Sequence, residues 1–144
     1  MILYVDSSAL IKLHVEEAGS AAVEQALAQA ETYTTSVLAY VETRSALARK
    51  RRDGSVTETE YANVVQTFEA DWERLAVVNL TPALVRRAGD GAEEYGLKAL
   101  DAVHLASALW LRDTSGSPTT FLCADRQLAR AALAAGLQTE LVGA

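Results

Sequence analysis

Hydrophobic and polar residues follow two alternating patterns along this chain. Short apolar or β-prone runs, each of a length that suits one strand, occupy residues 2–5, 32–35, 76–80, 119–125 and 139–143. Between these runs, apolar residues recur every three or four positions, which is the spacing of a helix with one buried face. These helical stretches cover residues 7–17, 20–30, 37–52, 57–75, 82–95, 97–113 and 126–136. Because strands and helices alternate, the pattern predicts a helix-rich α/β fold with three layers, α/β/α, around a parallel sheet of about five strands.

Residues at the predicted boundaries support this division of the chain. Ser36 is suited to cap the helix that follows the second run, since serine is a favoured N-cap. Thr57 and Glu60 have the spacing of a capping box, which marks the start of a helix. Pro82 stands at the first position of its helix, where proline is tolerated, and Gly96 is placed to end that helix.

The composition is that of an ordinary globular protein. Half of the 144 residues are hydrophobic and 22% are charged, far from a disordered composition. The chain has no repeat, low-complexity tract or linker, so we expect a single domain over residues 1–144. The single cysteine, Cys123, allows no internal disulfide. The opening apolar run is too short for a signal peptide or a membrane span, so we expect a cytoplasmic protein without a membrane partner.

Two acidic residues stand at the ends of predicted strands. Asp6 directly follows the run at 2–5, and Asp125 ends the run at 119–125. In open parallel sheets, binding sites form beyond the carboxyl ends of the strands, so both acids should lie on one rim. Each acid is also a favoured N-cap for the helix that follows it, and capping alone would explain either one.

Two further acids lie within predicted helices, on largely apolar faces. The positions three and four residues from Glu42 hold no cation, so an ion pair within its own helix is excluded. Asp101 lies among apolar residues, with Lys98 three residues before it as a candidate structural partner. An unpaired carboxylate on such a face is costly to bury. The simpler interpretation of Glu42 is an acid at the edge of this face that reaches water.

One cause would explain all four acids, namely that Asp6, Glu42, Asp101 and Asp125 converge on a divalent cation. Two carboxylates about 4 Å apart repel each other by roughly 4 kcal/mol at an effective dielectric constant near 20. A cluster of them therefore persists only with a bound cation or with raised pKa values. Oxygen donors suit Mg²⁺ or Mn²⁺. Such an ion activates water and binds phosphate oxygens, so the pattern predicts hydrolysis of phosphodiester bonds.

Zinc fits the sequence less well than these ions. The two histidines, His14 and His104, lie on separate apolar helices. Neither has a cysteine or histidine partner at the spacing of a zinc site. We interpret both as residues at the edge of the core.

Four stretches around these acids resemble the PIN-domain family, and specifically the VapC-type ribonuclease toxins of bacterial and archaeal toxin–antitoxin pairs. The stretches are YVDSSALIKL, SVLAYVETRSALAR, LKALDAVHLASAL and FLCADRQLARAA. The resemblance spans nearly the whole chain, and the first and third stretches together are fairly specific. It implies a single PIN-like domain with Mg²⁺- or Mn²⁺-dependent endoribonuclease activity. It also implies a homodimer that is inhibited by a cognate antitoxin.

The same resemblance implies roles for individual residues. Asp6 and Asp101 match the principal metal-binding acids of the family, and the other two acids match those that complete the catalytic site. Ser8 matches a hydroxyl that often follows the first acid by two residues and bonds to a carboxylate or a bound water. The chain departs from the family at Cys123, where Thr or Ser is usual two residues before the last acid. The role of Asp125 is therefore less firmly implied than its position.

A basic cluster, consisting of Arg49, Lys50, Arg51 and Arg52, ends the predicted helix at 37–52. Cations at this end of a helix suit its negative dipole terminus and need no further role. They are also candidates for contacts with RNA phosphates. The formal net charge of −6 argues against a protein that coats nucleic acid through bulk charge. It is compatible with an enzyme that holds RNA through a metal ion and this cluster.

Two other functions stay open at this point. An aspartyl phosphatase would use Asp6 as its nucleophile, but it needs a second Asp two residues later, and the chain has Ser8 there. A catalytically inactive PIN-like module that binds RNA or protein would be expected to lack one or more of the acids. Because the chain keeps all four, we expect the nuclease.

Overall fold

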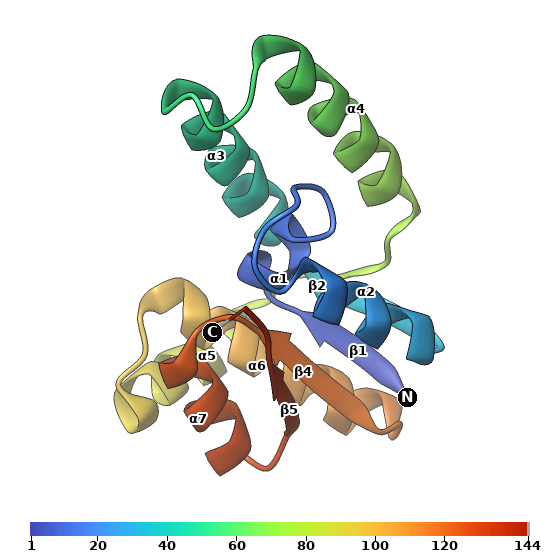
Figure 1. Ribbon diagram of the computed structural model, residues 1–144. Coiled ribbons are helices and arrows are strands. Elements are labelled where there is room, and N and C mark those ends of the chain that lie inside the picture. The colour runs from blue at the N-terminus through green and yellow to red at the C-terminus, as the bar shows by residue number, and fades with distance from the viewer. Residues whose placement is uncertain (144) are drawn as a thin grey trace.

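The computed structural model describes residues 1–143 as five strands and seven helices (Figure 1). The strands are β1 (Ile2–Val5), β2 (Thr32–Ser36), β3 (Val77–Val78), β4 (Thr119–Cys123) and β5 (Gln138–Leu141). The helices are α1 (Ser7–Ile11), α2 (Ser20–Gln29), α3 (Ala39–Arg52), α4 (Glu58–Arg74), α5 (Pro82–Tyr95), α6 (Ala99–Ser115) and α7 (Arg126–Ala134). None of these helices within residues 1–143 combines the length and hydrophobicity needed to cross a bilayer.

The five strands form one parallel sheet in the order β3-β2-β1-β4-β5. Tyr4 of β1 is in register with Thr34 of β2 on one side and with Phe121 of β4 on the other. The chain builds the sheet outward from β1 to β3, then returns through α5 and α6 to place β4 on the other side of β1. The order therefore reverses between β1 and β4, and open α/β sheets bind their ligands at the carboxyl ends of such a strand pair.

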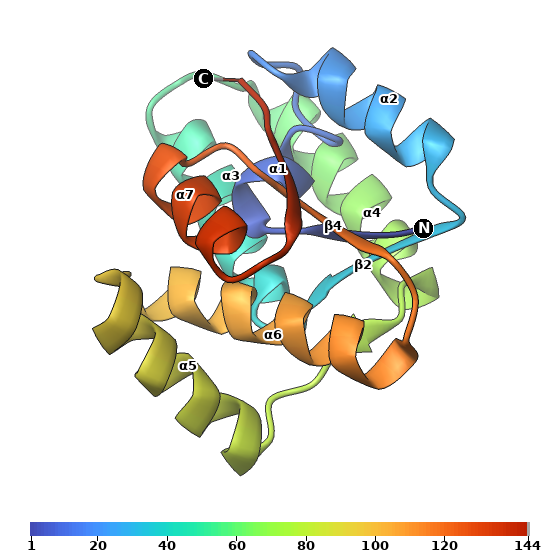
Figure 2. The same cartoon turned by 90° about the horizontal axis from the view of Figure 1, so that it is seen from below.

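The two faces of the sheet are covered by separate hydrophobic cores, because successive residues of a strand point to opposite faces. Tyr4 and Phe121 stack with ring centroids 5.5 Å apart, in the core that also contains residues of α5, α6 and α7. Leu3, Val5 and Leu122 belong to the other core, together with residues of α1, α2 and α4. Figure 2 shows the sheet between these two layers of helices. The predicted three-layer α/β/α fold is confirmed.

The first helix is shorter than the pattern at 7–17 predicted. It ends at Ile11, and the N–H groups of Lys12, Leu13 and His14 bond to carbonyls three residues back instead of four. Leu13 still packs against the core from these tighter turns, and the ring of His14 meets that of Phe68 edge-on at 5.2 Å. The predicted helix was therefore too long, because apolar residues continue at helical spacing beyond the true end of α1.

Helices α3 and α4 form a hairpin that stands away from the sheet (Figure 1). The predicted capping box starts α4, where Glu60 N–H donates to Thr57 Oγ1 at 3.1 Å and Thr57 N–H donates to Glu60 Oε1 at 2.9 Å. Arg44 of α3 forms an ion pair with Glu69 of α4 at 2.7 Å. These contacts hold the hairpin together, and α3 in turn packs against α1 at the carboxyl edge of the sheet.

Candidate active site

Asp6 and Asp125 lie beyond the carboxyl ends of the neighbouring strands β1 and β4. Both also cap the next helix, as the alternative interpretation proposed. Asp6 Oδ1 accepts the N–H of Ala9 at 2.9 Å, and Asp125 Oδ1 accepts the N–H of Leu128 at 2.8 Å. Capping engages Oδ1 in each case, and a carboxylate has a second oxygen that can bind an ion. The two interpretations of these acids are therefore compatible.

A hydroxyl connects the two strand ends, and a thiol lies at the end of β4. Ser8 Oγ donates to Asp6 Oδ1 at 2.7 Å and accepts the N–H of Ala124 at 3.0 Å. Cys123 is buried, and its Sγ lies 3.6 Å from the carbonyl oxygen of Asp125. Burial raises the pKa of this thiol to about 12, so it stays protonated. A weak S–H donor thus stands where the family usually has a hydroxyl.

Glu42 near the start of α3 has hydrogen-bond partners on two other helices. Its Oε1 lies 2.8 Å from His104 Nε2 of α6, and its Oε2 accepts from Ser7 Oγ of α1 at 3.0 Å. Burial alone would raise the pKa of Glu42, but the hydrogen bonds and charge of His104, together with the Ser7 hydroxyl, hold it below its ordinary value. The side chain is therefore an ionised carboxylate fixed at both oxygens.

The acids at the strand ends and those on the helices influence one another electrostatically. Burial raises the pKa of Asp101 in the first turn of α6, and the negative charges of Asp125 and Glu42 raise it further, against the opposing influence of His104. Asp6 is only 3% exposed. Burial raises its pKa, and the charge of Asp101 adds to this shift, although the charge of His104 and the hydrogen bonds from Ser8 and Ala9 oppose it. Asp101 is thus the acid on which the charges of Asp125 and Glu42 act, and its own charge acts on Asp6.

The chemistry of this donor set fits Mg²⁺ or Mn²⁺. Its members are all carboxylates. A cation among them would favour their ionised forms and so lower the raised pKa values of Asp6 and Asp101. Within residues 1–143, no three acidic, histidine or cysteine side chains are close enough together to form a complete metal cage. Mg²⁺ keeps several water ligands and needs only one or two carboxylates together with substrate oxygens. A partial, hydrated site is therefore consistent with this arrangement.

A groove of about 320 Å³ opens between α1, α3 and α6, and of the four acids Glu42 lines it. Its lining residues are Ser7, Ser8, Ile11, Glu42, Ser45, Ala46, Arg49 and Leu100. The basic cluster is therefore divided. Arg49 lines the groove, whereas Lys50 forms an ion pair with Glu17 at 3.1 Å and the Arg51 guanidinium lies 4.4 Å from the ring centroid of Tyr61.

Sequence reasoning missed the contact between His104 and Glu42. The interpretation of His104 as a core residue is correct for its burial, since it is 1% exposed, but its ring also bonds to one of the predicted acids. Its place three residues after Asp101 puts both side chains on the same side of a helix, which signals nearness to that acid but not the bond to Glu42. His14 has no such role, because it lies in the other core beside Phe68.

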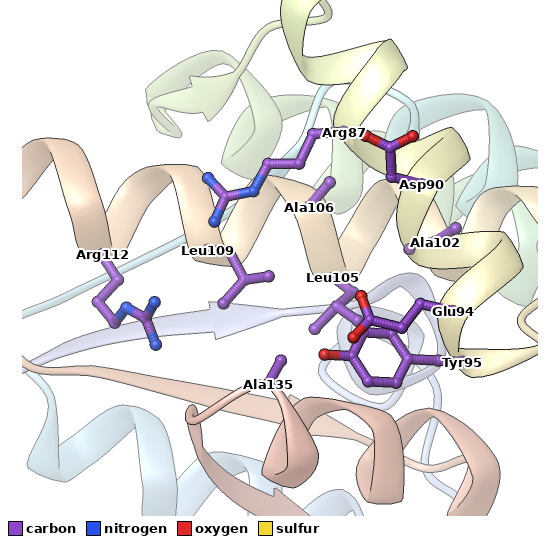
Figure 3. A pocket seen from close by; sticks show the side chains of 11 residues that line it. Arg87, Asp90, Glu94, Tyr95, Ala102, Leu105, Ala106, Leu109, Arg112 and Ala135 are labelled. Carbon is purple, nitrogen blue, oxygen red and sulfur yellow. The ribbon is translucent and has the colours of Figure 1, made fainter.

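A second cavity, of about 250 Å³, lies between α5, α6 and the end of α7 (Figure 3). Arg87 and Arg112 line it, and both form ion pairs with Asp113, at 3.0 and 3.1 Å. The lining also contains Asp90 and Glu94 of α5. None of the four predicted acids lines this cavity, so we assign it no part in catalysis.

Comparisons with known proteins agree with the fold and cover almost the whole chain. The PIN domain family model matches residues 3–134. Ribonuclease VapC45 and ribonuclease VapC49 of Mycobacterium tuberculosis are each 37% identical to the chain over 135 residues, which is 94% of this chain and 92% of each relative. Both relatives are thus matched over almost their full length.

Solved structures share the fold at lower sequence identity. PAE2754 from Pyrobaculum aerophilum has a TM-score of 0.67 at 22% identity, over 96% of this chain and 83% of that one. VapBC2 from Rickettsia felis, solved with a DNA fragment from its promoter, has a TM-score of 0.64 at 13% identity over 99% of both chains. The chain therefore belongs to the PIN-domain family, among its VapC-type members.

Proposed function

We propose that this chain is a Mg²⁺- or Mn²⁺-dependent endoribonuclease and the toxin of a toxin–antitoxin pair. The observation that carries the proposal is the placement of Asp6 and Asp125 beyond the carboxyl ends of the neighbouring strands β1 and β4. Glu42 is held by α1 and α6, and its charge and that of Asp125 act on Asp101. The 37% identity to two proteins named ribonuclease VapC supports RNA as the substrate.

The four acids divide into two pairs in this proposal. Asp6 and Asp101 are the principal metal ligands, and Glu42 and Asp125 complete the site. When bound, the ion supplies an activated water and neutralises charge on the phosphate. Ser8 orients the Asp6 carboxylate through its 2.7 Å hydrogen bond.

RNA reaches these acids through the groove between α1, α3 and α6. Arg49 lines the groove and is suited to contact a backbone phosphate, because its guanidinium can donate two parallel hydrogen bonds. Lys50, Arg51 and Arg52 add positive charge at the same end of α3. A single strand fits this open edge best, because its backbone and bases are accessible without unpairing a duplex.

The proposal includes a cognate antitoxin, a homodimer and a cytoplasmic location. The resemblance to VapC-type toxins supports all three, and the fold likeness to VapBC2 agrees with it. We expect the chain to co-purify from its native host with a small partner protein and to run as a dimer or larger complex. Recovery of the lone monomer from native cells would contradict both partner assignments.

Incubation of the purified protein with total RNA tests the proposed activity. We expect cleavage at defined positions with Mg²⁺ or Mn²⁺ and none with EDTA. Asp101→Asn should abolish metal-dependent cleavage, because it removes a charged ligand. Asp113→Asn is the matched control, since Asp113 lies on the same helix but forms ion pairs with Arg87 and Arg112 away from the groove. RNA that is bound but uncut in either metal would favour the inactive binding module instead.

A further inference from the structure

The buried histidine of α6 connects the core of the sheet to the acidic site. His104 Nδ1 lies 2.8 Å from the Tyr4 hydroxyl, and His104 Nε2 lies 2.8 Å from Glu42 Oε1. Tyr4 is itself buried in β1 and stacks on Phe121. A continuous series of hydrogen bonds thus runs from Tyr4 through His104 and Glu42 to Ser7.

The chemistry of the partners fixes the orientation of the ring. Burial raises the pKa of Tyr4, so its phenol keeps its proton and can donate to His104 Nδ1. His104 Nε2 then carries a hydrogen and donates to the Glu42 carboxylate, which only accepts. Turning the ring by 180° would place carbon atoms against both partners. The two contacts therefore specify one ring orientation, with hydrogen on Nε2 facing Glu42.

Glu42 needs external support more than the two acids at the strand ends. Asp6 and Asp125 have short side chains that are held by hydrogen bonds to the start of the next helix. Glu42 has one more rotatable bond than Asp and projects from a helix, so only contacts with other elements can select its rotamer. Those contacts are His104 and Ser7, of which His104 is the more deeply buried.

We propose that His104 is a positioning residue, which holds Glu42 in the orientation that metal binding and cleavage require and itself contacts neither the ion nor the RNA. The inference rests on the proposed function, because it assumes that Glu42 belongs to the metal site. Loss of a hydrogen-bond partner behind a metal ligand typically costs about 10–100-fold in metal affinity or activity.

Two substitutions of His104 separate its two contacts. A Gln side chain reaches about as far as Nε2, so His104→Gln keeps an N–H donor for Glu42. An Asn side chain reaches only about as far as Nδ1, so His104→Asn keeps a group for Tyr4 and leaves Glu42 without its partner. His14→Asn is the matched control, since His14 is the other histidine of the chain and is also buried.

The readouts are the Mn²⁺ dissociation constant, measured by electron paramagnetic resonance, and the kcat and KM of RNA cleavage. We expect His104→Asn to weaken Mn²⁺ binding and lower kcat by about 10–100-fold, with little change in KM. His104→Gln should stay within a few-fold of wild type, and His14→Asn should change neither quantity.

A double-mutant cycle decides whether His104 acts through Glu42. In the Glu42→Ala background, His104→Asn should cause no further loss of Mn²⁺ affinity or kcat. Full additivity of the two substitutions, or equal losses in His104→Asn and His104→Gln, would overturn the inference.

Nuclear magnetic resonance of the wild-type protein gives a test that needs no stable His104 variant. We expect the ¹⁵N shifts of His104 to report hydrogen on Nε2, and the Nε2 signal to move on addition of Mg²⁺. Hydrogen on Nδ1 alone, or a signal indifferent to Mg²⁺, would contradict the positioning role. Mn²⁺ binding needs no RNA, so a wild type that shows the predicted coupling but cuts no RNA would refute the proposed activity alone.

Discussion

At the scale of single residues, Asp6 combines two roles that the sequence presents as alternatives. Its Oδ1 caps α1 and accepts a hydrogen bond from Ser8, while the same buried carboxyl lies within the electrostatic influence of Asp101. Because a carboxylate has two oxygens, a helix cap at the end of a central strand can also be a metal ligand. An acid at a strand end should therefore not be dismissed because it is a good N-cap.

Asp101→Asn should stabilise the metal-free protein. The substitution removes a charge whose pKa is raised by burial and by its acidic neighbours, so neutralisation relieves repulsion. We expect a gain on the order of 1 kcal/mol, or a rise of about 3 °C in Tm for a chain of this size, in thermal unfolding with EDTA. Asp113→Asn should give no gain, because the Arg87 hydrogen bond and Arg112 lower the pKa of Asp113. A clear loss of stability in Asp101→Asn would count against a shared site.

The stability gained by Asp101→Asn should depend on pH. Below the unfolded pKa near 3.8, Asp101 is protonated in both states, and the wild type and variant should differ little. As pH rises, the unfolded state loses its proton first, so the folded wild type loses stability relative to the variant until its own raised pKa is passed. Unfolding in urea between pH 4.5 and 7.5 measures this difference. A stability gain of Asp101→Asn that shrinks as pH rises would contradict the raised pKa of Asp101.

The four acids could be predicted from the sequence, but the partners of Glu42 could not. Strand ends and apolar helix faces are visible in a local pattern, which is why Asp6 and Asp101 stood out. The bond between His104 and Glu42 joins residues 62 positions apart in the chain. No local spacing encodes that contact, and it arises only when α3 and α6 meet at the edge of the sheet.

At the scale of elements, the capping box of α4 gives a direct test of local helix chemistry. Thr57→Ala removes the Oγ1 acceptor of the Glu60 N–H and should cost about 1 kcal/mol of unfolding free energy. Thr67→Ala in the same helix is the control, since Thr67 Oγ1 bonds only back to Asn63 in its own helix and alanine favours helices. Equal destabilisation by both substitutions in urea titrations would contradict the capping role.

Arg49 and Arg51, at the basic end of α3, should contribute unequally to RNA binding. Arg49→Gln should raise the dissociation constant and reduce the slope of log K against log salt by about 0.7, the value of one phosphate contact to a single strand. Arg51→Gln should change this slope less, because Arg51 stacks on Tyr61. Fluorescence anisotropy with labelled RNA, in the inactive Asp101→Asn background, measures both. A larger effect of Arg51→Gln would contradict the assignment of the groove.

Element boundaries were predictable at some caps but not at all of them. Ser36, which was predicted to cap the helix at 37–52, is the last residue of β2, and α3 begins after Leu38 without a side-chain cap. The start of α4 at its capping box and the start of α5 at Thr81–Pro82 match the predictions. The end of α1 does not, because tight turns after Ile11 continue to bury apolar residues at nearly helical spacing. A hydrophobic pattern reports which residues are buried, and it reports the local hydrogen bonding only indirectly.

At the scale of the whole molecule, the site follows from the strand order. The alternation of strands and helices predicts a parallel sheet, but it does not say that β4 lies beside β1. The return of the chain through α5 and α6 makes that pair, and with it places Asp6 and Asp125 beyond the ends of neighbouring strands. Asp6 and Asp125 come from near the two ends of the chain, and Glu42 and Asp101 come from helices above the same edge. Sheet topology thus brings distant residues to one site.

The central claim is that these carboxylates share one divalent ion. Anomalous diffraction from crystals grown with Mn²⁺ tests it directly, because the ion itself scatters. We predict a peak about 2.1–2.2 Å from oxygens of both Asp6 and Asp101, and its loss in Asp101→Asn crystals grown in the same way. Mn²⁺ found only at other positions, with Asp6 and Asp101 unligated at saturating metal, would contradict the account.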